Sequence, residues 1–137
     1  MKPIFYISCF LSLIIASCRE PKIEDIVGLW RSKDGAQIIF KKGGEFETKS
    51  LPRSIVFGVY SDKKLIDVSG NWEIVNFEKR WIISFSIEKG DSLYDKIQGG
   101  FNCQLEIDYS YINFKSPFIL YFWGKDYNYK YKFYKKI

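Results

Sequence analysis

Apolar and polar residues alternate one by one along several stretches of this chain. The clearest case sets Ile66, Val68, Gly70, Trp72 and Ile74 against Asp67, Ser69, Asn71 and Glu73. Successive side chains of a strand point to opposite faces, so this stretch predicts a strand with one face on a core and the other in water. Trp81 to Ile87 and Phe101 to Tyr109 repeat the pattern.

Two tight turns divide the stretch that precedes this strand. Asp34-Gly35 and Gly43-Gly44 separate three short apolar runs, which are Ile26 to Arg31, Ala36 to Lys41 and Glu45 to Lys49. Dipeptides of this kind between apolar runs are the strongest short-range signal for hairpins. The first part of the chain therefore predicts three consecutive antiparallel strands.

Three further runs predict strands at Ser54 to Tyr60, Phe118 to Trp123 and Tyr129 to Tyr134. Leu51-Pro52-Arg53 is expected to break the chain before the first of them, and Glu88 to Gly100 is expected to be the longest irregular stretch. No long segment has the period of a helix.

Eight or nine strands at a spacing of roughly ten residues predict an all-β fold. Short connections favour a single antiparallel meander that closes into a small barrel, because closure leaves no open edge. Eight strands enclose a lumen that holds side chains or one small ligand. With 12 Phe, 10 Tyr and 4 Trp in the chain, we expect a mostly filled interior.

The N-terminus has the features of a secretory signal. Lys2 precedes an apolar run from Ile4 to Ala16, about thirteen residues and too short to span a bilayer comfortably. The run ends in Ile15-Ala16-Ser17-Cys18, which resembles the lipobox of bacterial lipoproteins. The resemblance implies cleavage before Cys18 and acylation of its thiol, and two or three acyl chains anchor a protein where one would not. A plain secretory signal or an uncleaved short helix are the alternatives.

This interpretation divides the chain into three parts. Residues 1–17 are the signal peptide, residues 18–25 hold the lipidated cysteine and a short polar tether, and residues 26–137 form the barrel domain. In the lipoproteins that this signal resembles, an Asp directly after the cysteine is associated with retention in the inner membrane. This chain has Arg19 at that position. We therefore expect a lipid-anchored envelope protein, at the outer membrane if the cell has two.

Gly28-Leu29-Trp30 and the Asp34-Gly35-Ala36 turn after it resemble the start of lipocalin-like (calycin) barrels. A second Gly70-x-Trp72 adds a loose resemblance to small bacterial lipoproteins. The resemblance implies a barrel that binds a small apolar ligand, and it identifies no ligand residue. Trp30 and Trp72 are expected to be core aromatics.

Several kinds of chemistry lack their residues. The chain has no His, which removes Ser-His and Cys-His catalytic pairs and His-ligated zinc. Cys9 leaves with the signal and Cys18 takes lipid, so Cys103 has no disulfide partner and is expected to be a small buried hydrophobe. The carboxylate pairs Glu45/Glu47 and Glu106/Asp108 are interpreted as solvated strand faces. We expect no enzyme activity, no cofactor and no metal.

The net charge is +5, and Lys alternates with aromatic residues in the final run, Tyr127 to Lys136. Such a run is compatible with binding to single-stranded nucleic acid, but an exported protein seldom meets nucleic acid. A terminal strand that points its lysines outward also explains the run. The hypothesis is a monomeric envelope protein that binds a small ligand or a protein partner. The alternative is an inhibitor or immunity-type lipoprotein that blocks a hydrolase or toxin through Glu88 to Gly100.

Overall fold

A computed structural model describes residues 20–57, 63–90, 100–107, 118–124 and 129–136. Two short helices and ten strands lie in these ranges. The helices are α2 (Ile23–Ile26) and α3 (Arg53–Phe57). The strands are β1 (Gly28–Arg31), β2 (Gln37–Phe40), β3 (Glu45–Lys49), β4 (Leu51–Pro52), β5 (Leu65–Ile66), β6 (Val68–Phe77), β7 (Arg80–Gly90), β8 (Gly100–Ile107), β9 (Phe118–Trp123) and β10 (Lys130–Lys135).

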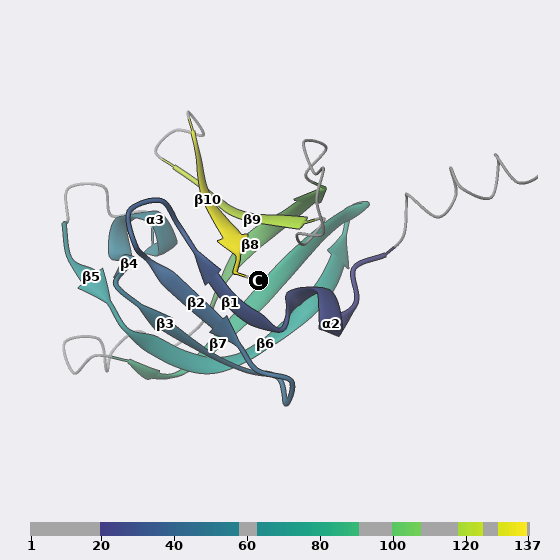
Figure 1. Cartoon of the computed structure of the whole chain (residues 1–137), viewed down its shortest axis with the longest axis horizontal. Coiled ribbons are helices and arrows are strands. Elements are labelled where there is room, and N and C mark those ends of the chain that lie inside the picture. Colours follow the sequence, from purple (N-terminus) through teal and green to yellow (C-terminus); the bar gives the residue numbers. More distant parts are fainter. Residues whose placement is uncertain (1–19, 58–62, 91–99, 108–117, 125–128, 137) are drawn as a thin grey trace, which may run out of the picture.

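Eight of the strands form a closed barrel in the order β1-β10-β9-β8-β7-β6-β3-β2 (Figure 1). Every neighbouring pair is antiparallel, and each strand pairs with the next barrel strand along the chain. The two-residue strands β4 and β5 pair separately and lie outside this order. The prediction of an all-β antiparallel meander that closes into a barrel is confirmed.

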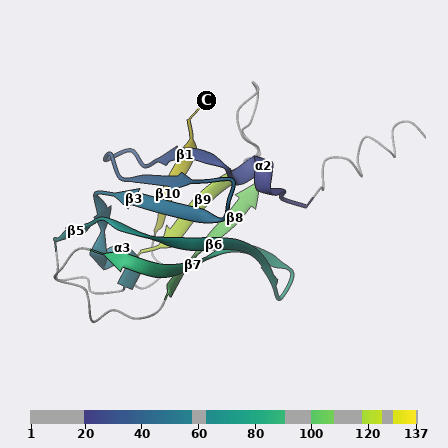
Figure 2. The same ribbon diagram turned by 90° about the horizontal axis from the view of Figure 1, so that it is seen from below.

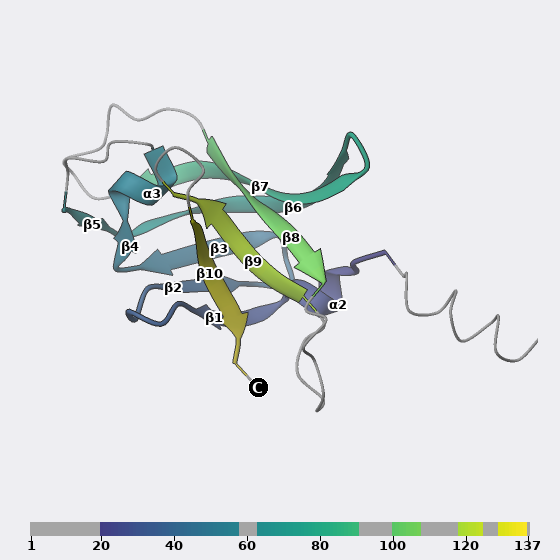
Figure 3. The same ribbon diagram turned by 90° about the horizontal axis from the view of Figure 1, so that it is seen from above.

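Antiparallel strands alternate in direction, so the connections of the barrel fall at two ends. The α2 end holds α2, the β2–β3 and β6–β7 turns and the last residues of β10, as Figures 2 and 3 show. The α3 end holds the β1–β2 turn, α3 and the β4–β5 pair. Because β1 runs from one end to the other, a site at the β1–β2 turn lies opposite α2.

Aromatic side chains fill the described interior. Inward residues of different strands meet edge to face or stacked, as in the pairs Phe40–Trp72, Phe46–Phe85 and Phe85–Phe101, with ring centroids 4.4 to 5.1 Å apart. Such contacts stabilise a core beyond the area that they bury. Phe122 and Phe133 continue the same cluster towards the seam between β10 and β1.

Trp30 closes the barrel at the α2 end. Its side chain is fully buried, and its indole Nε1 donates a hydrogen bond of 2.7 Å to the carbonyl oxygen of Ile26, at the end of α2. Lys135 of β10 crosses Gly28, where a Cβ would lie 3.1 Å from its Cε, and donates to the carbonyl oxygens of Glu24 and Asp25 at 3.1 and 3.2 Å. Gly28 has a φ of 134°, which other residues rarely adopt.

The prediction of a strand at Ser54 to Tyr60 is wrong, because Arg53–Phe57 form the helix α3. Its β-branched and aromatic residues suggested a strand. The short helix instead buries Ile55 against the core and contacts β8 and β9, so that it covers the α3 end of the barrel. Burial of one face outweighs the strand propensity of Ile55, Val56 and Phe57.

Three boundaries also differ from the sequence prediction. Glu88–Gly90 belong to β7 and Gly100 begins β8, so the predicted irregular stretch is wrong at both its edges, while residues 91–99 lie outside the described part. Leu51–Pro52, expected only to break the chain, pair with β5. Residues 23–25, assigned to a tether, are helical.

Candidate functional site

The predicted lipidation site, Cys18, lies outside the described residues. The described chain begins at Glu20, and Pro21 is already buried. Within this part of the chain, no helix has the length and apolar character needed to cross a membrane.

Cys103 sits on the inner face of β8 with 1% of its surface exposed. Burial raises the pKa of its thiol far above the ordinary value, and the backbone hydrogen bond at Ile83 offsets only part of that effect. A thiol that stays protonated is a poor nucleophile. The structure thus confirms that Cys103 is a buried hydrophobe.

Two of the four candidate carboxylates, Glu47 and Glu106, form ion pairs with lysines. Glu47 accepts a hydrogen bond from Lys41 at 2.7 Å, and Glu106 accepts one from Lys130 at the same distance. Asp108 lies outside the described residues. In the described part, no three His, Cys, Asp or Glu residues gather where they could hold a metal ion.

An open pocket lies at the seam where β1 and β10 meet. The two strands pair only at Trp30↔Lys135 and Arg31↔Tyr134, and beyond that point they diverge. The gap, with a volume of about 460 Å³, is named the seam pocket, and its lining residues are Ser32, Lys33, Asp34, Lys130, Tyr131, Lys132 and Tyr134.

A polar cluster joins the two walls of the seam pocket. Tyr131 of β10 and Ser32 of the β1–β2 turn both donate hydrogen bonds to one carboxylate oxygen of Asp34. The Ser32 hydroxyl accepts a 3.0 Å hydrogen bond from the amide of Ala36 and lies 3.1 Å from the Tyr131 hydroxyl. These contacts join the turn to the last strand.

The polar cluster shifts the pKa values of Asp34 and Tyr131. Burial alone would raise the pKa of Asp34, but the hydrogen bonds from Ser32, Tyr131 and nearby backbone amides together hold that pKa below its ordinary value. Burial, together with the hydrogen bond to Asp34, raises the pKa of the Tyr131 phenol. Asp34 is therefore a carboxylate and Tyr131 a neutral donor at neutral pH.

The pocket carries more positive than negative charge. The side chains of Lys33 and Lys132 form no hydrogen bond or ion pair with any residue in the described ranges. Asp34 already accepts hydrogen bonds from Ser32 and Tyr131, and Lys130 forms an ion pair with Glu106. Two lysines and the exposed ring of Tyr134 are left to meet a partner.

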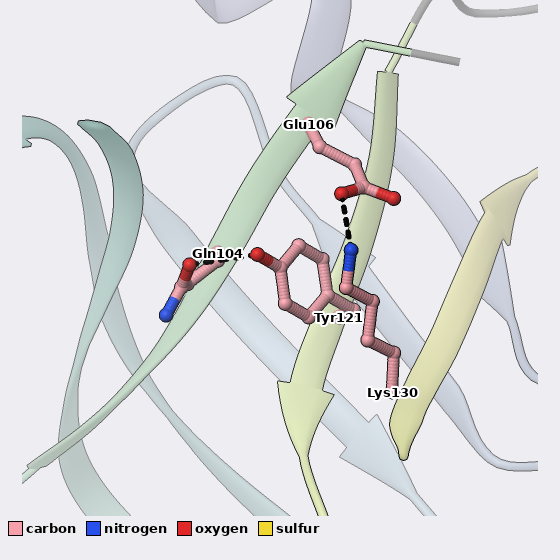
Figure 4. A network of polar contacts seen from close by, with 4 residues as sticks. All are labelled: Gln104, Glu106, Tyr121 and Lys130. Atoms are coloured by element: carbon pink, nitrogen blue, oxygen red, sulfur yellow. Dashed lines mark hydrogen bonds and ion pairs between the residues drawn. The ribbon is translucent and has the colours of Figure 1, made fainter. Parts of the chain in front are cut away.

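A polar network extends the pocket onto the outer face of β8 and β9 (Figure 4). Tyr121 donates a hydrogen bond of 2.7 Å to the side-chain oxygen of Gln104. Lys130 lies above the ring of Tyr121, 4.6 Å from the centroid, and 5.5 Å from the ring of Trp123. The hydrogen bond to Glu106 raises the pKa of Lys130, so this surface keeps its charge.

A second open pocket, of about 470 Å³, lies where β3, β6 and β7 meet. Two lysines and two carboxylates balance each other among its lining residues, which are Glu47, Thr48, Lys49, Asp67, Val68, Ser69, Lys89 and Gly90. The Thr48 hydroxyl there accepts from the amide of Val68, and Asp67 accepts from the amide of Ser50. Thr48 and Asp67 of this pocket are therefore already hydrogen-bonded to backbone amides.

Sequence reasoning did not find the seam pocket. It placed Asp34 in a turn and the lysines of the last strand outward, which the structure confirms for Lys130 and Lys132 but not for Lys135. It did not foresee that Asp34 and Tyr131 meet across 97 positions of sequence. The predicted closure of the barrel could have indicated this site, because a closed meander places its last strand beside its first.

Comparison of the chain with protein-family models, with curated proteins and with solved structures finds no match to any of them.

Proposed function

We propose that this protein is a lipid-anchored, non-enzymatic envelope protein whose lipocalin-like barrel binds a protein partner on its outer surface, at the seam pocket. Acylation of Cys18 holds it to a membrane, and in a cell with two membranes that membrane is the outer one. The partner presents an acidic patch to Lys33 and Lys132.

The filled interior is the observation that carries this proposal. Phe40, Phe46, Phe85 and Phe101 occupy the space in which a barrel of this size would hold a small ligand. Neither of the two pockets described above is lined by these rings. An outer site is therefore favoured over an internal one.

The composition of the seam pocket supports a protein partner. Tyr134 offers a rigid aromatic surface, of the kind that is enriched in protein interfaces. Charge complementarity at such a rim speeds association and selects the partner. Because the pocket lies at the α3 end, opposite the chain's attachment, it faces away from the membrane.

Pull-down from envelope extracts tests the binding site. Lys33→Glu/Lys132→Glu should lower partner recovery roughly tenfold or more, as expected when charged pairs become repulsive. Lys42→Glu/Lys63→Glu makes the same change in net charge on exposed residues outside the pocket and should leave recovery unchanged. Equal recovery with both variants would refute the site.

Intact mass tests the anchor. The wild-type protein should carry acyl chains, and Cys18→Ser should lack them and move to the soluble fraction. A wild-type mass without acyl chains would refute the anchor and leave the binding site to be judged by the pull-down.

The identity of the captured protein separates the main proposal from an inhibitor or immunity role. A captured hydrolase or toxin whose activity falls when this protein binds would establish the second role. The filled interior is also compatible with an inhibitor or immunity role, since such a protein acts through its outer surface. Most of the contact segment predicted for that role, Glu88 to Gly100, lies outside the described residues.

A further inference from the structure

The β6–β7 hairpin extends beyond its neighbours. β6 pairs with β3 only at Ser69 to Asn71, and β7 pairs with β8 only from Ile82 to Ser86. Within the described chain, residues 73–77 of β6 therefore pair only with β7, and residues 80–81 of β7 pair only with β6. This two-stranded extension is named the finger, and it projects at the α2 end of the barrel in Figures 1 and 3.

The tip of the finger exposes apolar surface. Phe77, the residue before the turn, is 60% exposed, more than any other described large apolar residue. Val75 and Ile82 lie opposite each other on the same face of the hairpin and are partly exposed. Ile23 of α2, at the same end of the barrel, is 52% exposed.

The charges of the finger cancel. Glu73 and Glu78 are balanced by Lys79 and Arg80, all of them exposed. Attraction to charged headgroups therefore supplies little net force, and apolar burial is the force that the finger can offer. A phenyl ring that enters the region between headgroups and acyl chains gains that burial.

The chain length near the anchor fixes which end of the barrel meets the membrane. Pro21 is buried on the domain, and only three Cα–Cα steps separate it from Cys18, at most about 11 Å. A lipid on Cys18 thus holds the α2 end against the bilayer. The finger extends from that same end.

We infer that the finger is a second membrane contact, with Phe77 inserted into the bilayer surface beside the lipid anchor. This inference rests on the proposed acylation of Cys18. The lipid on Cys18 sets which end of the barrel meets the membrane, and the second contact limits rotation about that point, so that the seam pocket is presented away from the membrane.

An environment-sensitive dye on Asn76→Cys tests this contact. Asn76 is an exposed residue of the finger, and its replacement leaves the finger's charge unchanged. The matched control is Lys63→Cys, an exposed position beside β5 at the α3 end. The buried Cys103 should stay unlabelled. Both proteins are made as the full chain, purified with their acyl groups, and placed in phosphatidylcholine vesicles.

The dye at position 76 should shift its emission to shorter wavelength, and nitroxide lipids should quench it roughly twofold or more compared with position 63. The shift should persist at high salt, since the finger has no net charge. Phe77→Ser should abolish it and Phe77→Leu should keep it, while circular dichroism shows that both variants fold.

Three results would overturn the inference. Emission at position 76 equal to that in water, on protein whose mass shows acyl chains, would refute the finger and leave the anchor standing. A shift that Phe77→Ser does not change would remove the role of the ring. A mass without acyl chains would refute the anchor, and with it the orientation on which the contact depends.

Discussion

Trp30 shows how one residue joins two elements. Its ring fills the α2 end of the barrel, and its indole N–H satisfies the carbonyl of Ile26 where α2 ends. A helix end buried without such a partner would leave a polar group that neither water nor protein satisfies. The Gly28-x-Trp30 pair is therefore needed for packing and for hydrogen bonding at once.

Trp30→Phe should lower the free energy of unfolding by about 1–3 kcal/mol, because the Ile26 carbonyl loses its donor and the smaller ring leaves space. Urea unfolding followed by circular dichroism measures this. Trp81→Phe is the matched control, since Trp81 is only partly buried. An equal loss in both variants would contradict the role of the hydrogen bond.

Asp34 makes the seam sensitive to acid. Its pKa is lower in the folded state than the ordinary 3.8, so its contribution is fully present above that value and is lost as the pH falls through the folded pKa. Below pH 3.8, the free energy of unfolding should therefore fall less steeply with pH in Asp34→Asn than in the wild type.

Carboxyl NMR should also show the Asp34 pKa rising in Tyr131→Phe, and an unchanged titration would exclude the contact.

At the scale of elements, the β6–β7 turn combines a tight loop with unsuitable residues. Phe77 pairs with Arg80, so the loop is the two residues Glu78 and Lys79, and both have positive φ values, 49° and 65°. This is a type I′ geometry, in which Asn-Gly is preferred. The finger thus keeps a strained tip.

Glu78→Asn/Lys79→Gly should raise the free energy of unfolding by about 1–2 kcal/mol, because both replacements tolerate a positive φ. Thermal unfolding measures the gain. Lys42→Gly, in a turn where φ is not positive, should give a small loss instead. A gain in the control as large as in the variant would show that turn geometry is not the cause.

Most elements could be predicted because their side chains alternate with a period of two. β6, β7 and β8 each bury one face, and the pattern follows directly from the pleat. α3 could not be predicted, since three of its five residues favour strands and the helix is explained by the burial of Ile55 over the end of the barrel. That site exists only in the closed molecule.

For the whole molecule, closure and a filled interior were predictable from strand count and aromatic content. The seam pocket and the finger were not, because both depend on where neighbouring strands stop pairing. The divergence of β10 from β1 after Arg31, and of β7 from β8 before Ile82, is set by register. A strand's own alternation carries no information about its partner's length.

A filled barrel should bind no apolar ligand inside. Native mass spectrometry of the protein released by Cys18→Ser should give the mass of the bare chain, and an apolar dye that fluoresces in lipocalin-type cavities should remain dark. Recovery of a stoichiometric small molecule would contradict the filled interior, because the rings of Phe85 and Phe101 stack 4.4 Å apart in that space.

The seam between β1 and β10 has a consequence for synthesis. The first barrel strand finds one of its two neighbours only when the last strand arrives, more than ninety positions later. A ribosome product that stops before residue 130 would present two unpaired borders, on β1 and on β9, and such borders recruit other chains. The barrel can therefore close only after β10 has been made, and until then chaperones can protect the two unpaired edges.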